Sequence, residues 1–328
     1  MFDTHYDMLS KIYMCYLNND FSYIENWVKN YNFDNVKGLI VNLYFMSLDE
    51  MKEECGENYY KDGDSVIDMF RISTELLHKF IPSDIVVLTS IEGCDYLKDE
   101  NDLVELKKLG LNSIMIVWNN KNKFASGNKT KDGLTPLGEK LIRKAVELNI
   151  GIDLSHANET TFWDIVNLIK REKLKANVYA THSNVRTLCD RERNLKDEQI
   201  KAIQELGGFV GVMSHSRFIE YDGVEERNKR FGTPSYLEYR EYLKDKYAKH
   251  LKYIYDLTGD ITALCTSTDD MGFLELEEYK EGPIFEYSTI NKELRKYLKK
   301  YFNDKEVEMI MYENAYNHLK PLLDGKGN

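Results

Sequence analysis

Six side chains of this sequence that can bind metal ions or move protons stand at or just after short apolar runs. The first two, His5 and Asp7, flank Tyr6 in the opening DTHYD. Residues two apart on a strand point to the same face, so this spacing directs an imidazole and a carboxylate to one place. An HxD pair taken alone is a weak signal, because a short motif needs its structural context. The six side chains are His5, Asp7, Glu92, His156, His182 and Asp269.

Together these groups predict a site that binds two metal ions and hydrolyses its substrate. Zinc takes imidazole nitrogen and carboxylate oxygen as ligands, and one carboxylate can bridge two ions. Two ions about 3.5–4 Å apart can activate a water molecule and polarise a carbonyl group. Each residue alone has a plainer interpretation, since a histidine after a strand is often a structural residue and an acidic residue often caps the next helix. His215 also lies just past an apolar run, so this position cannot by itself select ligands.

The apolar runs themselves are typical of buried parallel strands. They are continuous rather than alternating, as expected of strands that are covered on both faces. Helical patterns separate several of them, at 136–149 after Thr135 and at 197–206 before Gly207, and a long amphipathic helix is predicted within 231–257. The eight runs are the opening FDTH, 36–45, 84–93, 111–118, 150–156, 176–183, 207–214 and 261–268.

Eight strands that alternate with helices predict an α/β fold, a (β/α)8 TIM-type barrel that forms one domain over residues 1–328. In such a barrel the functional groups lie at the C-terminal ends of the strands, which is where the six side chains fall. The alternative is an open, doubly wound sheet. No glycine-rich phosphate loop follows the first run, which disfavours a nucleotide-binding version of that sheet.

The composition excludes several kinds of partner. A net charge of -11 disfavours a nucleic acid or an anionic membrane surface. No apolar run is long enough to span a bilayer, and no basic stretch followed by an apolar core opens the chain, so we expect no membrane segment and no signal peptide. The cysteines are odd in number and form no CxxC pair, which favours reduced thiols in a cytoplasmic protein. They are Cys15, Cys55, Cys94, Cys189 and Cys265.

Several motifs, in the same order along the chain, resemble those of the membrane dipeptidases, also called renal dipeptidases, a family of zinc peptidases with a (β/α)8 barrel. DTHYD at 3–7 is similar to the family's opening motif, and SIEG at 90–93 to the segment with its bridging glutamate. The most specific match is GLTPLGEKLIRKAVELNIGIDLSHANETTFWDI at 133–165, followed by ATHSNVRTLCDRERNLKDEQIKAIQELGGFVGV at 180–212. CTSTDDMG at 265–272 resembles the last barrel strand of the family more loosely.

The resemblance implies how a pair of zinc ions would be held. His5, Asp7 and Glu92 would bind one ion. Glu92, His156 and His182 would bind the second, so that Glu92 bridges the two. The implied cofactors are therefore two zinc ions per chain.

The resemblance also implies the residues that handle the substrate. Arg193 would bind the substrate carboxylate, whose shape matches the planar guanidinium group. Asp269 would contact the substrate amine or assist proton transfer, and with Glu92 it is a predicted catalytic residue. Asn119 stands where mammalian members carry a substrate-contacting histidine, and it can donate a hydrogen bond to a carbonyl oxygen. Met271 replaces the second aspartate of the final motif, and the glycines before that motif are missing. We expect these departures to affect substrate preference and rate more than metal binding.

The implied function is zinc-dependent hydrolysis of dipeptides, including those with a C-terminal D-residue, by a metal-bridged hydroxide. One alternative is another barrel amidohydrolase that acts on a lactone, cyclic amide or phosphoester, and a second is a non-catalytic barrel that binds a small molecule. An HxD rather than an HxH motif disfavours the first alternative, and five retained ligands disfavour the second. The long helix at 231–257 can bury its apolar face on its own barrel or on a second subunit, which leaves a homodimer open.

Overall fold

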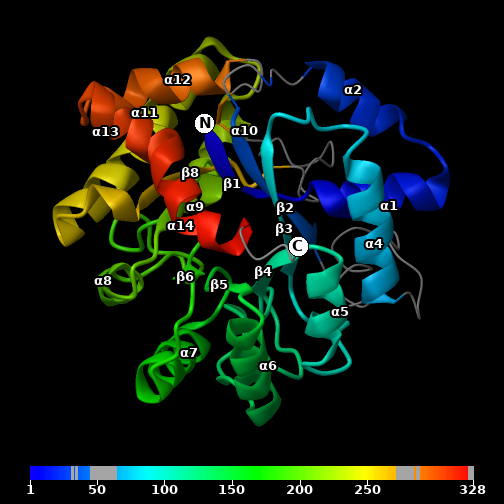
Figure 1. Cartoon of the computed structure of the whole chain (residues 1–328). Helices are drawn as coiled ribbons and strands as arrows, with labels where there is room; N and C mark the ends of the chain where they lie inside the picture. The colour runs from blue at the N-terminus through cyan, green and yellow to red at the C-terminus, as the bar shows by residue number, and fades with distance from the viewer. Residues whose placement is uncertain (31–32, 34–35, 45–64, 271–283, 286–288, 324–328) are drawn as a thin grey trace. The chain divides into compact units, whose positions relative to one another are not determined.

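A computed structural model gives the structure of the chain for residues 1–30, 33, 36–44, 65–270, 284–285 and 289–323 (Figure 1). The eight apolar runs are confirmed as strands, although most strands are shorter than the predicted runs, and those within 150–156 and 176–183 are the shortest. Met271 and Cys55 lie outside the described residues. The strands are β1 (Phe2–Tyr6), β2 (Gly38–Tyr44), β3 (Val86–Glu92), β4 (Leu111–Met115), β5 (Gly151–Asp153), β6 (Val178–Tyr179), β7 (Val210–Met213) and β8 (Leu264–Ser267).

The strands pair in a parallel arrangement wherever their register is defined. Six strands form one sheet in the order β1-β2-β3-β4-β5-β6, and β7 pairs with β8. The register places Glu92 opposite Met115, Met115 opposite Asp153, and Asp153 opposite Tyr179. The C-terminal ends of β3 to β6 are therefore level with one another. Loops that leave these strands start at one edge of the sheet, where parallel α/β proteins place their functional groups.

The helices follow the strands as the sequence predicts, and their ends have identifiable causes. The helix at 136–149 begins after Thr135, whose side chain accepts a hydrogen bond from the Gly138 N–H group. The long helix ends at Gly259, which adopts a left-handed conformation. The helices are α1 (Met8–Asn18), α2 (Ser22–Asn30), α4 (Val66–Leu77), α5 (Asp102–Lys108), α6 (Pro136–Glu147), α7 (Glu159–Glu172), α8 (Asp197–Glu205), α9 (Ser216–Ile219), α10 (Gly223–Arg230), α11 (Pro234–Thr258), α12 (Ile290–Leu298), α13 (Asp304–Glu308) and α14 (Asn314–Leu323).

The chain divides into two compact units, each built from separate stretches of sequence. The first unit comprises Met1–Tyr6, Asn30–Leu39 and Ala180–His318. The second unit comprises Asp7–Lys29, Ile40–Tyr179 and Leu319–Asn328.

In the first unit the long helix α11 covers the two strands β7 and β8. It packs on both strands and contacts α8, α9, α10 and α12. Tyr247 of α11 is buried and donates a hydrogen bond to the backbone oxygen of Val212 in β7. His250 of the same helix is also buried, and so is His215 after β7. Both histidines are therefore packing residues of this unit.

In the second unit, helices cover the strands that lead to the candidate ligands. Helix α6 packs on β5 and on α7, helix α5 packs on β4, and α4 contacts both α1 and α5 (Figure 1). The strands are fully buried at β4 and β5, as expected of parallel strands covered on both faces. No described helix is both long and apolar enough to traverse a bilayer.

Candidate metal and substrate site

In the first unit, His5, His182 and Asp269 lie together. The imidazole rings of His5 and His182 have centroids 3.6 Å apart, and both side chains are almost completely shielded from solvent. The Nε2 atom of His5 is 3.8 Å from Oδ1 of Asp269, whose side chain is 21% exposed. Three of the six predicted side chains therefore form one group in this unit. Their nitrogen and oxygen donors are those that zinc and similar divalent ions accept.

A hydroxyl group contacts both of these imidazole rings. Thr181 Oγ1 lies 3.1 Å from Nδ1 of His5 and 2.9 Å from Nδ1 of His182. The sequence interpretation passed over Thr181, although it directly precedes His182 in ATHS. Metal-binding histidines usually donate their second ring N–H to an oxygen acceptor, which orients the ring.

Asp269 is held from both sides by residues of β1. Asp3 accepts hydrogen bonds from the Thr268 N–H group at 2.9 Å and from the Thr268 hydroxyl at 2.5 Å. On the other side, the Tyr6 hydroxyl donates to Asp270 Oδ2 at 2.6 Å, and the two residues form a parallel β-bridge. We call these four residues, Asp3, Tyr6, Thr268 and Asp270, the aspartate clamp. Complete burial raises the pKa of Asp3 to about 7, against the lowering effect of its hydrogen bonds with Thr268.

Arg193 is also in the first unit, where its guanidinium group is buried beside His182. It donates hydrogen bonds to the backbone oxygen of His182 at 2.8 Å and to Ser183 Oγ at 2.9 Å. The adjacent Asn194 donates from its amide group to the backbone oxygen of Phe218. The segment that carries the predicted carboxylate-binding arginine is thus fastened directly to the segment that carries a predicted metal ligand.

In the second unit, Glu92 and His156 meet at the level ends of β3 and β5. Glu92 is the last residue of β3 and is buried, and its Oε1 atom lies 3.2 Å from Nε2 of His156. Two ligands at about 2.0–2.2 Å from one tetrahedral zinc ion are separated by roughly 3.3–3.6 Å. The contact therefore fits two ligands of a shared ion, as well as an ion pair with a protonated imidazole.

Asn119 lies against His156. Its side-chain oxygen accepts a hydrogen bond from Nδ1 of His156 at 2.9 Å. The backbone fixes the same arrangement, because Asn128 N–H donates to the His156 oxygen and Lys129 N–H donates to the Asn119 oxygen. Gly127 permits this close approach, since a Cβ atom there would lie 1.8 Å from the backbone oxygen of Trp118. The sequence predicted a substrate contact for Asn119, and the structure gives it a partner among the predicted metal ligands.

Asp7 is the first residue of the second unit and directly precedes helix α1. Its side chain is buried but makes no capping hydrogen bond with α1. The plainer interpretation of a lone aspartate, a cap for the next helix, therefore does not explain Asp7.

Backbone conformation singles out two of the predicted residues. Five non-glycine residues of the described chain have a positive φ angle, and Asn19, Asn149 and Lys173 lie where helices end. The other two are His156 at +66° and Asp269 at +57°. A left-handed conformation is unfavourable for such residues and often marks a functional site.

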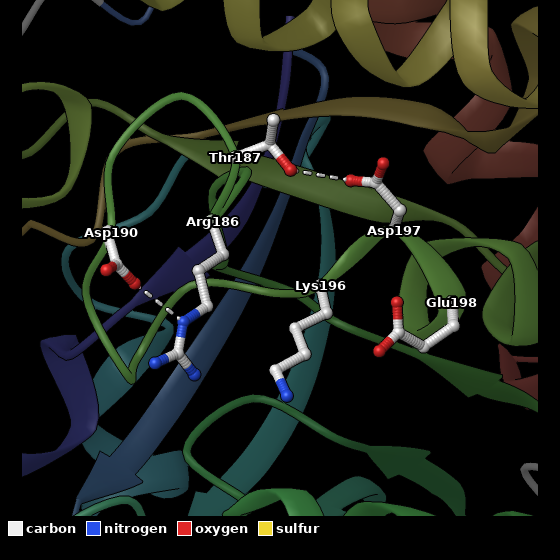
Figure 2. Close-up of a pocket in the computed structure, with 6 residues that line it drawn as sticks. All are labelled: Arg186, Thr187, Asp190, Lys196, Asp197 and Glu198. Carbon is white, nitrogen blue, oxygen red and sulfur yellow. Dashed lines mark hydrogen bonds and ion pairs between the residues drawn. The ribbon is translucent and has the colours of Figure 1, made fainter.

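A surface pocket of the first unit contains none of the predicted site residues. Figure 2 shows Arg186 paired with Asp190 at 2.9 Å and the Thr187 hydroxyl bonded to Asp197 at 2.9 Å. The pocket has a volume of about 440 Å³. Cationic and anionic groups are mixed around it, so it does not select one sign of ligand charge. It is lined by Arg186, Thr187, Asp190, Lys196, Asp197 and Glu198.

The sequence matches the family described as membrane dipeptidase (peptidase family M19) over residues 57–320. The chain belongs to this family. The matched residues include Glu92, His156 and His182, so the resemblance drawn from the central motifs is confirmed. The opening DTHYD lies before the matched residues. The roles of all the candidate ligands and substrate-binding residues stay predictions.

Two curated relatives are similar to about half of the chain. An uncharacterised protein in a PQQ-III 3′ region of Acinetobacter calcoaceticus is 35% identical over 173 residues, which cover 50% of this chain and 53% of that protein. An uncharacterised protein in a pqqA 5′ region of Klebsiella pneumoniae is 31% identical over 185 residues, which cover 54% of this chain and 62% of that protein. The matched part of the chain thus spans about half to three fifths of the length of these two relatives.

Solved structures match over more of the chain. A metallopeptidase from Rhodobacter sphaeroides, liganded with a phosphinate mimic of the dipeptide L-Ala-D-Ala, has a TM-score of 0.72 at 19% identity and covers 98% of both chains. A probable dipeptidase from Pseudomonas aeruginosa has a TM-score of 0.65 at 16% identity and covers 88% of this chain and 86% of its own. At these identities the likeness shows the fold, which is that of dipeptidases of this family.

Proposed function

We propose that this protein is a metallodipeptidase that holds two zinc ions with His5, Asp7, Glu92, His156 and His182. The observation that carries the proposal is the 3.2 Å approach of His156 Nε2 to Glu92 Oε1, within the residues matched to the dipeptidase family. The approach of His5, His182 and Asp269 to one another supports it independently. The donors are all imidazole nitrogens and carboxylate oxygens, which suit zinc.

The bound ions would supply Lewis acidity and lower the pKa of a water molecule toward neutrality, which is the chemistry that amide hydrolysis requires. The chain's own residues would position the substrate and move its protons. Glu92 would help to hold both ions, and Asp269 would move a proton from the attacking water to the leaving amine. The left-handed backbone at Asp269 keeps this carboxylate beside His5.

Arg193 would bind the free carboxylate of the substrate. Its guanidinium group is a planar fork of N–H donors that can grip a carboxylate with two parallel hydrogen bonds. The bonds to His182 and Ser183 fix its orientation and thereby reduce the entropy lost on binding. The related metallopeptidase from Rhodobacter sphaeroides binds a mimic of L-Ala-D-Ala, which supports dipeptides with a C-terminal D-residue as the substrate class.

We also propose that the eight strands close into a (β/α)8 barrel. Two isolated parallel bridges within the first unit support this closure: Ala180 pairs with Val210 of β7, and Tyr6 of β1 pairs with Asp270, which follows β8. A single domain over residues 1–328 and a homodimer remain predictions. A cytoplasmic location is supported by the four described cysteines, all of which are buried free thiols.

The first test is release of free amino acids from L-Ala-L-Ala, L-Ala-D-Ala and their C-terminal amides by zinc-loaded protein. We expect release that requires metal and is much faster for the free acids than for the amides. No release from protein that holds two zinc ions would move the substrate toward a lactone, cyclic amide or phosphoester. Neither release nor retained zinc would favour the non-catalytic binding protein.

Two variants test individual roles. His156→Ala should lose one zinc ion and most of its activity, whereas His78→Ala, which removes an exposed histidine of the same unit, should keep both. Full zinc content and turnover in His156→Ala would refute the ligand assignment.

Arg193→Ala should raise KM for dipeptides with a free carboxylate and leave the slow hydrolysis of amides unchanged. An equal effect on acid and amide would exclude carboxylate recognition by Arg193.

A further inference from the structure

A histidine can bind a metal ion only through a ring nitrogen that carries a lone pair. The neutral imidazole has one N–H group and one lone pair, and the hydrogen bond at one nitrogen decides which form is present. An oxygen that can only accept a hydrogen bond therefore fixes the proton on the nitrogen it contacts. The opposite nitrogen is then the one available to a metal.

Asn119 fixes the proton of His156 in this way. Its side-chain oxygen has no hydrogen to donate, so the 2.9 Å contact requires an N–H group at Nδ1 of His156. In the neutral ring the lone pair then belongs to Nε2, which is the atom 3.2 Å from the Glu92 carboxylate. A lone pair and a carboxylate oxygen repel one another unless a cation lies with them, so this tautomer is matched to a metal-binding role.

The Thr181 hydroxyl contacts the rings of both His5 and His182, and its single hydrogen limits which tautomers these rings can adopt. A hydroxyl has two acceptor lone pairs but only one hydrogen, so it cannot donate to Nδ1 of both His5 and His182. At least one of these rings must donate its own Nδ1–H to Thr181 Oγ1, at 3.1 Å or 2.9 Å respectively. If both rings donate, each presents Nε2, and that of His5 already lies 3.8 Å from Asp269.

We propose that Thr181 and Asn119 are positioning residues that fix the Nδ1–H tautomer of three histidines, so that His5, His182 and His156 all bind metal through Nε2. The hydrogen bonds require the Nδ1 proton on His156 and on at least one of His5 and His182. The same proton on both of these rings is our proposal, and its use in metal binding rests on the proposed function. A single hydroxyl thus sets the ligand atom of two rings in the first unit, and a single amide oxygen sets that of one ring in the second unit.

The direct test measures the tautomers by nitrogen-15 NMR of the histidine rings in metal-free protein at about pH 8, above the ordinary histidine pKa. We expect His5, His182 and His156 in the Nδ1–H form in the wild type. His250 is an internal reference for the opposite tautomer. Its Nδ1 accepts a hydrogen bond from Val185 N–H, so its proton must be on Nε2. An Nε2–H form at any of the three rings would overturn the proposal for that ring.

Matched variants connect the tautomers to metal affinity. Thr181→Val keeps the shape of the side chain but removes the acceptor, whereas Thr181→Ser keeps the hydroxyl. We expect Thr181→Val to shift His5 and His182 away from the Nδ1–H form and to weaken zinc binding by about 10–100-fold in chelator competition, with recovery in Thr181→Ser. Unchanged affinity and tautomers in Thr181→Val would overturn the role of Thr181.

Asn119 has two candidate roles, positioning of the His156 ring and binding of the substrate. A comparison of two variants separates them. Asn119→Leu removes the acceptor, and Asn119→Asp retains it. A positioning role predicts weaker zinc binding and an altered His156 tautomer in Asn119→Leu only. A raised KM with unchanged zinc affinity and tautomer would instead assign Asn119 to the substrate and overturn the positioning role. Should all tautomers be as proposed while no dipeptide is hydrolysed, the proposed function fails and the assignment of the ring protons stands.

Discussion

His156 and Asp269 adopt the same rare backbone conformation in different units, and different kinds of group hold them. Apart from the Glu92 carboxylate near Nε2, the groups that support His156 are neutral. Asn119 binds its ring, Asn128 binds its backbone oxygen, and Gly127 allows the loop to approach. The ends of β3, β4 and β5 lie in register beneath this loop and give it a rigid base.

Around Asp269 the supporting groups are carboxyl groups buried in the fold. The aspartate clamp holds its two neighbours in the chain: Asp3 binds Thr268, and Tyr6 binds Asp270. Asp3 is fully buried, and Asp270 nearly so.

This contrast shows two ways to stabilise a residue in a costly conformation. A left-handed residue costs roughly 1–2 kcal/mol, which the surrounding contacts must exceed. Hydrogen bonds from neutral amides and backbone groups stabilise the left-handed residue at any protonation state. Substitutions near them destabilise the fold mainly through steric clashes. Buried carboxyl groups form stronger hydrogen bonds but depend on their charge and on complete pairing, so that the loss of one partner is expensive.

The largest effect should come from steric disruption beside His156. In Gly127→Ala the new Cβ would lie 1.8 Å from the Trp118 backbone oxygen, which cannot move alone. We expect a loss of about 3 kcal/mol in the free energy of unfolding, measured in urea, because the backbone at residue 127 must separate from Trp118 and Asn119, which follow β4. Gly207→Ala is the control, since its Cβ meets open space and only its φ of +76° is strained, at about 1 kcal/mol. Equal losses in both variants would mean that the close approach does not hold the loop.

The next effect should come from removal of the aspartate clamp. Asp3→Ala leaves the buried N–H and hydroxyl groups of Thr268 without their acceptor, at a cost of about 2–3 kcal/mol. We expect kcat to fall more than KM rises, because the chain at Asp269 loses its support while Arg193 is untouched. Asp3→Asn retains one acceptor oxygen, so its stability and its kcat should lie between those of the wild type and those of Asp3→Ala. A stable Asp3→Ala variant with unchanged kcat would show that β8 positions Asp269 by itself.

An ionisable group also supports the segment after His182, and this extends the contrast to pH. His250 accepts a hydrogen bond from Val185 N–H and donates one to the Ile219 oxygen, while burial lowers its pKa from 6.5 to about 4. Between pH 4 and 6.5 the unfolded chain binds a proton at His250 that the folded chain does not bind. The stabilising contribution of His250 is therefore fully present above about pH 6.5 and is lost as the pH falls toward 4. The slope is up to about 1.4 kcal/mol per pH unit.

The His250 contribution can be isolated by difference. His215, whose pKa is lowered to about 3 by burial, adds a similar slope that remains in the variant His250→Gln. We expect unfolding free energies measured from pH 4 to 7 to fall less steeply for His250→Gln than for the wild type. Parallel curves would mean that protonation of His250 does not weaken this segment.

Much of the fold could be predicted from local sequence patterns. Continuous apolar runs locate all eight strands because these strands are buried, and Thr135 and Gly207 mark helix ends through their own side-chain and backbone preferences. The residues that end these runs included the groups found together in each unit. The short length of β5 and β6 was not predictable, since the apolar pattern continues past the last paired residue.

The supporting residues were harder to predict because their partners are distant in sequence. Asp3 bonds to Thr268 across 265 positions, and Thr181 bonds to His5 across 176. Local signals did exist: Asp3 shares a strand face with His5 by the period of two, and Thr181 adjoins His182. These signals indicate position only, and the hydrogen-bond partner emerges from the tertiary structure.

The smallest effect we expect tests whether both halves of the aspartate clamp matter. Tyr6→Phe removes the hydroxyl that donates to Asp270 at 2.6 Å and keeps the buried ring. The hydrogen bond involves a carboxylate, so its loss should cost about 1.5 kcal/mol, less than Asp3→Ala, since the parallel bridge between the two backbones remains. In the double variant Asp3→Asn with Tyr6→Phe, a fold-loss of kcat greater than the product of the single fold-losses would show that the two sides of the clamp support Asp269 cooperatively. A loss equal to the product of the single losses would show instead that the two sides of the clamp support Asp269 independently of one another.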